Sequence, residues 1–146
     1  FQIVNYYNYC LDANDAGSTA GMNGDKVQLW TCTGKNNQYW EYGGESASGN
    51  FTLINHQYPS KCLNADDAGG LKDGQKVQLW DCGVDTSNEY WDVADWATCV
   101  DSGLDCTLPL EADNYKWVLD AEAQHIGDGD KVQIWTPNGL LNQYWY

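Results

Sequence analysis

The chain has 146 residues, enough to bury one ordinary hydrophobic core, so we expect a single domain. Seven lysines and no arginine stand against 21 acidic residues, and the formal charge of −14 argues against nucleic acid, anionic membranes and heparin as partners. No stretch is typical of a signal peptide or a membrane-spanning helix, so no direct membrane insertion is expected. Trp and Tyr far outnumber Phe, and aromatic rings that carry a polar atom suit contact with sugars.

Three anchor segments recur three times in the same order along the chain. The first anchor occupies residues 10–13, 62–65 and 118–121, the second residues 26–30, 76–80 and 131–135, and the third residues 37–40, 88–91 and 142–145. A turn that contains glycine precedes each copy of the second anchor, Lys-Val-Gln-Leu/Ile-Trp. The period of about 50 residues predicts three repeats, about 1–48, 49–97 and 98–146, within one domain that spans 1–146.

Within each repeat, short runs rich in Val, Ile, Tyr and Trp alternate with clusters of Gly, Asn and Asp, which is the pattern of strands and turns. We find no convincing helical period and predict an all-β fold with about four strands per repeat, about twelve in all. In the second repeat the expected strands are 51–54, 62–65, 76–81 and 89–93. Periodicity leaves a sandwich, a short propeller and a closed trefoil open.

The doubled Gln-x-Trp motifs resemble those of the ricin B-chain type lectins over the whole chain, for example at 28–30 and 38–40 and again at 133–135 and 143–145. The resemblance implies a β-trefoil, which is a six-stranded barrel capped by three hairpins with pseudo-threefold symmetry. It also implies one shallow sugar site in each repeat. Family ligands are galactose, N-acetylgalactosamine and, in modules appended to glycosidases, xylan or related polysaccharides. The partners implied are therefore glycans, and a longer chain could also carry a catalytic or toxin domain.

The residue types fit sugar chemistry. Alternate residues of a strand share a face, so Gln28 and Trp30 point away from Val27 and Leu29. An indole ring can stack on the apolar face of a sugar, and a carboxylate can accept from two neighbouring hydroxyls, with an Asn amide as donor. The resemblance gives the following Gln a supporting role beside the carboxylate. We predict two complete sites, Asp12, Gln28, Trp30, Asn37 and Gln38 in repeat 1, and Asp120, Gln133, Trp135, Asn142 and Gln143 in repeat 3.

The second repeat departs from this pattern by a reciprocal exchange, with Asn64 in the place of Asp and Glu89 in the place of Gln. The exchange can keep an internal hydrogen bond while a neutral acceptor replaces the carboxylate that faces the sugar. We therefore predict a weaker or altered site from Asn64, Gln78, Trp80, Asn88 and Glu89. The tryptophans that end each third anchor, Trp40, Trp91 and Trp145, correspond to buried core residues of the family.

The six cysteines follow the repeats. Cys10 and Cys32 bracket the same segment of repeat 1 as Cys62 and Cys82 do in repeat 2, and repeat 3 lacks both partners together. The predicted disulfides are Cys10–Cys32, Cys62–Cys82 and Cys99–Cys106. Disulfides in a small chain indicate an oxidising compartment, and we expect a secreted, extracellular protein.

Nothing in the sequence calls for catalysis, a cofactor or a metal. The two histidines, His56 and His125, fall at unrelated places in the repeat, and a site repeated three times suits weak multivalent binding better than catalysis. Asp128-Gly129-Asp130 matches no EF-hand spacing and is expected to be a turn. Two alternatives remain open, a polysaccharide-targeting module of a secreted glycosidase with xylan or galactan as ligand, and a trefoil protease inhibitor.

Overall fold

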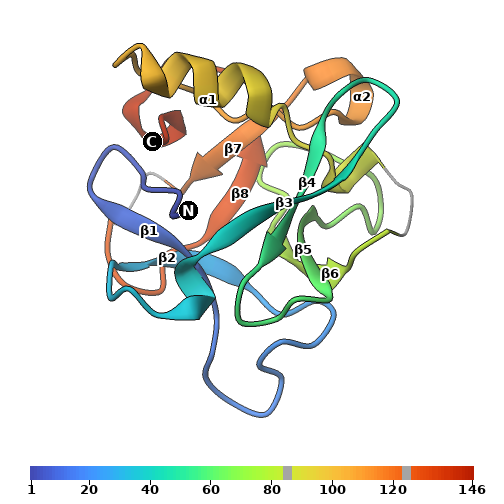
Figure 1. Ribbon diagram of the computed structural model, residues 1–146, viewed down its shortest axis with the longest axis vertical. Helices are drawn as coiled ribbons and strands as arrows, with labels where there is room; N and C mark the ends of the chain where they lie inside the picture. The colour runs from blue at the N-terminus through green and yellow to red at the C-terminus, as the bar shows by residue number, and fades with distance from the viewer. Residues whose placement is uncertain (84–86, 123–125) are drawn as a thin grey trace.

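The computed structural model describes residues 1–83, 87–122 and 126–146, and Figure 1 shows the arrangement of its elements. Short antiparallel strands dominate this part of the chain. They are β1 (Tyr9–Ala13), β2 (Val27–Thr31), β3 (Trp40–Glu45), β4 (Phe51–Asn55), β5 (Lys61–Ala65), β6 (Val77–Asp81), β7 (Val118–Ala121) and β8 (Val132–Trp135). Three equivalent hairpins, β1–β2, β5–β6 and β7–β8, carry the first two anchors of each repeat.

The three hairpins close on one another in a ring. Isolated bridges join Lys26 to Gln78, Lys76 to Gln133, and Lys131 back to Gln28. Backbone bonds at the glycine turns repeat the cycle, since Gly24, Gly74 and Gly129 each donate to the hairpin of a neighbouring repeat, at Leu79, Ile134 and Leu29 over 2.8 to 2.9 Å. This cyclic closure distinguishes the fold from an open sandwich, and the all-β trefoil is the architecture.

Three tryptophans occupy equivalent positions in the core. Trp40, Trp91 and Trp145 are fully buried, and each indole Nε1 donates to the backbone carbonyl of a leucine in the first strand of its own hairpin, at Leu11, Leu63 and Leu119 over 3.0 to 3.1 Å. An indole N–H in a core needs such an acceptor. The prediction that these three rings belong to the core is correct.

The sequence predicted no helix, but one replaces the β3–β4 hairpin at the junction of repeats 2 and 3. α1 (Val93–Asp101) begins at the last residue of the strand expected at 89–93, and the Asp92 side chain caps it by accepting from the Asp95 amide. Trp96 is 5% exposed and donates from Nε1 to the Trp145 carbonyl over 3.1 Å. In Figure 1 the helix lies across one end of the molecule, near the chain's C-terminus.

Fewer strands form than the twelve expected, since the described residues contain eight. Several expected strands shrink to single bridges, as between Asn5 and Trp145 and between Trp91 and Leu110. The short element α2 (Ala112–Tyr115) is a left-handed turn rather than a helix, with φ of 50° to 60° at its last three residues. None of the helices in the described ranges is long and apolar enough to cross a membrane.

The disulfides join the pairs that the repeats predict. Cys10–Cys32 and Cys62–Cys82 tie equivalent positions in repeats 1 and 2, and Cys99–Cys106 ties the end of α1 to the segment that follows it. The two ends of the chain lie side by side (Figure 1), because Val4 and Tyr146 exchange two backbone hydrogen bonds of 2.7 to 2.8 Å.

Candidate functional site

Site 1 is built around the Asp12 carboxylate, which lies on β1 directly opposite Gln28 of β2. Gln28 Nε2 donates to Asp12 Oδ1 over 3.0 Å, and Asn37 Nδ2 and Gln38 Nε2 donate to Oδ2 over 2.8 and 2.9 Å. Asn37 and Gln38 come from the 3-10 helix η1 (Asn36–Gln38), which contacts β1. Three amides therefore fix one carboxylate, which is only 3% exposed.

An open cavity of about 230 Å³ lies over this carboxylate. Trp30 forms part of its wall and is 38% exposed, whereas Val27 and Leu29 of the same strand are buried. The alternation predicted for β2 is therefore present, with one face in the core and the other on the cavity. An exposed indole beside a fixed carboxylate gives the cavity one flat apolar surface and one charged acceptor.

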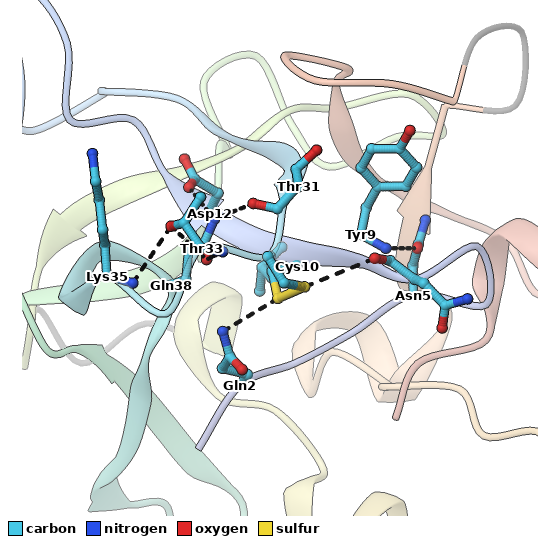
Figure 2. The surroundings of a disulfide bond; sticks show 12 residues. Gln2, Asn5, Tyr9, Cys10, Asp12, Thr31, Thr33, Lys35 and Gln38 are labelled. Carbon is cyan, nitrogen blue, oxygen red and sulfur yellow. Dashed lines mark hydrogen bonds between the residues drawn. A yellow bond between two sulfur atoms is a disulfide. The ribbon is translucent and has the colours of Figure 1, made fainter.

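Gln38 acts as a brace. Its Nε2 donates to both Asp12 Oδ2 and the Thr31 carbonyl, and its Oε1 accepts from the Thr33 backbone and hydroxyl. Figure 2 draws Gln38 together with Asp12 and Thr33, close to the Cys10–Cys32 disulfide. All hydrogens of this amide are used inside the protein, and the supporting role that the resemblance implied agrees with the geometry.

Two details of the predicted sugar contacts are wrong for site 1. Asn37 Nδ2 donates to Asp12 Oδ2 and to the Ala13 carbonyl, so both amide hydrogens are used and Asn37 cannot donate to a ligand. Of the roughly four lone-pair positions of a carboxylate, three accept from the amides. Asp12 can therefore accept from one ligand hydroxyl, at Oδ1, rather than from two. The second N–H of Gln28 is the donor that remains.

Site 3 repeats this arrangement. Asp120 on β7 accepts from Gln133 Nε2 at Oδ1 over 2.8 Å, and from Asn142 and Gln143 at Oδ2 over 2.9 and 3.0 Å. Asn142 donates its other amide hydrogen to a backbone carbonyl, that of Ala121, as Asn37 does to that of Ala13. Trp135 is 37% exposed on the wall of an open cavity of about 290 Å³.

Site 2 keeps the shape and changes the chemistry. Gln78 Nε2 donates to Asn64 Oδ1 over 3.1 Å, which places the Asn64 amide nitrogen where Asp12 and Asp120 have their second oxygen. Glu89 Oε1 accepts from the Gly83 backbone over 3.1 Å, as Gln38 Oε1 does from Thr33. Trp80 is 37% exposed on a cavity of about 250 Å³. The bond expected between Asn64 and Glu89 stays a prediction.

Burial changes the acidity of the two carboxylates. Loss of hydration raises the pKa of Asp12 above its usual value of 3.8, although the hydrogen bonds from Gln28, Gln38 and Asn37 act in the opposite direction. The pKa of Asp120 is raised for the same reason against the same kind of amide bonds. Each site thus holds a partly desolvated acceptor, which interacts more strongly with a hydroxyl donor than an exposed carboxylate would.

The sequence of residues 1–145 matches the family model described as the ricin-type beta-trefoil lectin domain. The chain belongs to this family. No curated protein matches the lectin domain by sequence.

Three solved structures share the fold at low identity. A designed threefold-symmetric protein, ThreeFoil, superposes with a TM-score of 0.74 at 22% identity, covering 99% of the lectin domain and 94% of that chain. The C-half of an earthworm R-type lectin, solved in complex with GalNAc, gives 0.68 at 16% identity, with 100% and 95% covered. An exo-β-1,3-galactanase of Clostridium thermocellum gives 0.72 at 20% identity, and the lectin domain covers only 28% of that longer chain while 99% of its own length is matched.

Each exposed tryptophan of the lectin domain is backed by the glycine turn of another repeat. A Cβ atom at Gly129 would lie 3.9 Å from Cζ3 of Trp30, and Gly24 and Gly74 stand in the same relation to Trp80 and Trp135 at 3.9 and 3.5 Å. All three glycines have φ between 86° and 89°, a conformation that favours glycine. The ring closure that forms the fold therefore also holds the walls of the three cavities.

Several cavity residues were not predicted. Lys26, Asp15 and Lys35 also line site 1, and Glu122 and Leu140 line site 3. The alternation that places Gln28 and Trp30 on one face also includes Lys26, so the sequence held a signal for this residue. The others come from loops, whose position no periodic pattern reveals.

Other residues considered from the sequence lie apart from the cavities. His56 is exposed and lines none of the three, while His125 lies outside the described residues. Asp128 caps the neighbouring repeat by accepting from the Thr31 backbone and hydroxyl over 2.5 and 2.9 Å, and Asp130 accepts from Gly127. The Asp130 bond is that of a turn, whereas the two Asp128 bonds join this turn to repeat 1.

Proposed function

We propose that this domain binds carbohydrate through shallow sites, with sites 1 and 3 as the principal ones and site 2 as a weaker one. The observation that carries the proposal is the repeated pairing of a half-exposed tryptophan with a fixed, buried Asp in an open cavity. A buried carboxylate is costly to a fold, and its appearance twice at equivalent places favours a role in binding.

The indole supplies the apolar part of the interaction. Trp30 and Trp135 each present more than a third of their surface to solvent beside the carboxylate. The C–H face of a pyranose can stack on such a ring and bury apolar surface, while the rim of the sugar stays near the polar groups. The glycine turns behind the rings hold them in place before the ligand arrives, which lowers the entropic cost of binding.

The polar part includes one acceptor beside one donor, and in site 1 the side-chain oxygens of Gln28 and Asn37 have no hydrogen-bond partner among the described residues either. In site 1 the acceptor and the donor are the remaining lone pair of Asp12 Oδ1 and the second N–H of Gln28, and in site 3 the same atoms of Asp120 and Gln133. A sugar hydroxyl both donates and accepts, so two neighbouring hydroxyls fit this pair. The hydroxyl bonded to the carboxylate forms the stronger, charge-assisted bond.

Terminal galactose or N-acetylgalactosamine is the ligand that we propose, because the family resemblance favours it and the earthworm lectin of the same fold was solved with GalNAc. A role as the polysaccharide-targeting module of a glycosidase, with a galactan- or xylan-type ligand, is the second candidate. It is favoured by the galactanase, of which a domain of this fold makes up 28%.

We propose that the domain is a single non-enzymatic unit of three repeats and that it works outside the cell. Binding through repeated sites needs no activated nucleophile, and the described linings of the three cavities contain no histidine or cysteine. The three disulfides support an oxidising, extracellular compartment.

The test is a glycan-binding measurement on the native domain and on two matched sets of variants. A shallow site of this kind should bind a monosaccharide with a Kd near ~1 mM, or about −4 kcal/mol, so a multivalent surface is needed. Trp30→Ala with Trp135→Ala should abolish retention on a galactoside surface. Trp80→Ala, which removes an equally exposed indole, should leave most of it. Silence of the folded native domain on galactosides and plant polysaccharides would refute carbohydrate binding and bring the protease-inhibitor alternative forward.

A further inference from the structure

The three cavities differ in charge. In site 1 two lysines, Lys26 and Lys35, stand among the lining residues with the carboxylates Asp12 and Asp15, and the formal charges cancel. The described lining of site 2 has Asp66 and Asp67 and no cation, and that of site 3 has Asp120 and Glu122 and no cation. On a protein with a formal charge of −14, a cavity with two lysines is an exception that calls for an explanation.

Lys26, Lys76 and Lys131 occupy equivalent positions in the three repeats, but within the described part of the chain only Lys26 lines one of the three cavities. The bonds of the other two lysines explain the difference. Lys76 Nζ donates to the Gly24 carbonyl over 3.2 Å and Lys131 Nζ to the Gly74 carbonyl over 2.6 Å, so both ammonium groups hold a neighbouring turn. Among the described residues Lys26 makes no equivalent bond to Gly129. Lys26 shares a strand face with Gln28 and Trp30 and lines the cavity of site 1 instead.

Lys35 is the second cation and is free to move. Its Nζ lies 3.8 Å from Asp15 Oδ2, and its side chain is 67% exposed. A long contact between exposed side chains contributes little to stability and is screened by salt. The ammonium can therefore leave Asp15 for an anionic group on a ligand at low cost, whereas the carboxylates of sites 2 and 3 would repel that group.

We propose that site 1 selects sugars that carry an anionic group, a carboxylate or a sulfate, through Lys26 and Lys35, whereas sites 2 and 3 select neutral sugars. The proposal rests on the proposed function of the same sites. Stacking on the tryptophan and bonding to Asp12 hold the ring, and the lysines read a charge at its rim. One domain would then attach to glycans that mix neutral and acidic residues.

The test uses a domain in which site 1 stands alone, made by Trp80→Ala with Trp135→Ala, and a second in which site 3 stands alone, made by Trp30→Ala with Trp80→Ala. Titration calorimetry compares methyl β-galactoside with methyl β-galacturonide for the carboxylate and with galactose 6-sulfate for the sulfate. At about 20 mM salt, site 1 should bind one or both anionic sugars about fivefold more tightly than the neutral one, and the preference should fade at about 500 mM. Site 3 should prefer the neutral sugar.

Substitution of the lysines identifies the cause. Lys26→Gln with Lys35→Gln in the first domain should reduce the ratio of the neutral to the anionic Kd to one or below. Lys72→Gln with Lys116→Gln removes the same charge from lysines that line none of the three cavities, and should keep the ratio. The proposed selection by charge would be overturned if a neutral sugar bound site 1 as tightly as both anionic ones, or if the ratio of the neutral to the anionic Kd survived loss of Lys26 and Lys35. Sugar binding itself would then still stand. Failure of every sugar at every site would instead overturn the proposed function.

Discussion

Gln28 donates to Oδ1 of Asp12 over 3.0 Å, while Asn37 and Gln38 both donate to Oδ2. The asymmetry leaves Oδ1 as the oxygen with room for a ligand, and it makes the ionised state of Asp12 essential. A proton on Oδ2 would face the N–H groups of Asn37 and Gln38, and a proton on the free position of Oδ1 would remove the acceptor that a ligand hydroxyl needs. Asp120 has the same asymmetry in site 3.

Sugar binding at sites 1 and 3 should therefore weaken in acid. Burial raises the pKa of both carboxyls above 3.8, so the loss should begin at a higher pH than for an exposed Asp. Affinity measured between pH 7 and pH 3.5 should fall with a midpoint above 3.8. Site 2 carries an amide at this position and should lose no affinity by this route.

The free energy of unfolding should depend on pH in the direction opposite to that of sugar affinity. A carboxyl whose folded-state pKa lies above its unfolded value contributes stability below the unfolded pKa and loses it as the pH rises through the folded pKa. In the native protein, ionisation of the two carboxyls should therefore lower the free energy of unfolding as the pH rises from about 4. Asp12→Asn and Asp120→Asn should remove this part of the pH dependence. Denaturant titrations at pH 4 and pH 7 would measure this, and a pH dependence of stability unaltered by both changes would contradict it.

Site 2 should be restored by reversing its reciprocal exchange. Asn64→Asp with Glu89→Gln recreates the Asp and Gln pair of sites 1 and 3, and should bring the affinity of site 2 to theirs. With the predicted contact between Asn64 and Glu89, Asn64→Asp alone would set a new carboxylate beside Glu89 and should destabilise the fold, because two buried like charges repel.

The two single changes and the double change form a cycle whose coupling energy should favour the double variant by about 1 to 3 kcal/mol. The measurement is the free energy of unfolding of all four proteins, together with titration of site 2 in a background that lacks Trp30 and Trp135. Additive effects of the two changes would show that Asn64 and Glu89 do not act on each other.

The two classes of tryptophan should respond differently to truncation. Trp40→Ala empties a fully buried site and removes the bond to the Leu11 carbonyl, so it should cost about 3–5 kcal/mol of the free energy of unfolding. Trp30→Ala removes a ring that is 38% exposed and should cost much less, about 1 kcal/mol or below. Urea unfolding of both variants tests this, and equal losses would place Trp30 in the core.

The repeats were enough to predict an all-β domain of three units, because each anchor is a strand or a cap that recurs with one role, and the family resemblance selected the trefoil among the possible arrangements. The alternation in 26–30 predicted which face of β2 enters the core, and the joint absence of two cysteines from repeat 3 predicted which cysteines pair. Helix α1 was not predicted, because the repeat pattern favoured strands in this segment although its local sequence has a helical signal. Val93, Trp96, Ala97 and Val100 follow the spacing of a buried helix face, and Asp92 stands at the capping position.

The residues of the sites could be predicted, but not how each of them bonds. The sequence placed Asn37 beside Asp12, yet it could not reveal that the Ala13 carbonyl takes the second hydrogen of Asn37. Which atoms remain for a ligand depends on backbone groups, which carry no sequence signature. The charge of the cavities was hidden for a related reason, since Lys35 and Glu122 reach them from loops.

The most direct test of the account is an NMR titration of the indole N–H signals of the eight tryptophans with galactose and N-acetylgalactosamine. The signals of Trp30 and Trp135 should move together with a Kd near ~1 mM, and that of Trp80 should move only at higher concentration. Those of Trp40, Trp91 and Trp145 should stay in place, since they are fully buried and bonded to internal carbonyls. If Trp30 and Trp135 remained unmoved at about 50 mM of either sugar, or if all three exposed rings titrated equally, the assignment of sites 1 and 3 as the principal galactoside sites would be wrong.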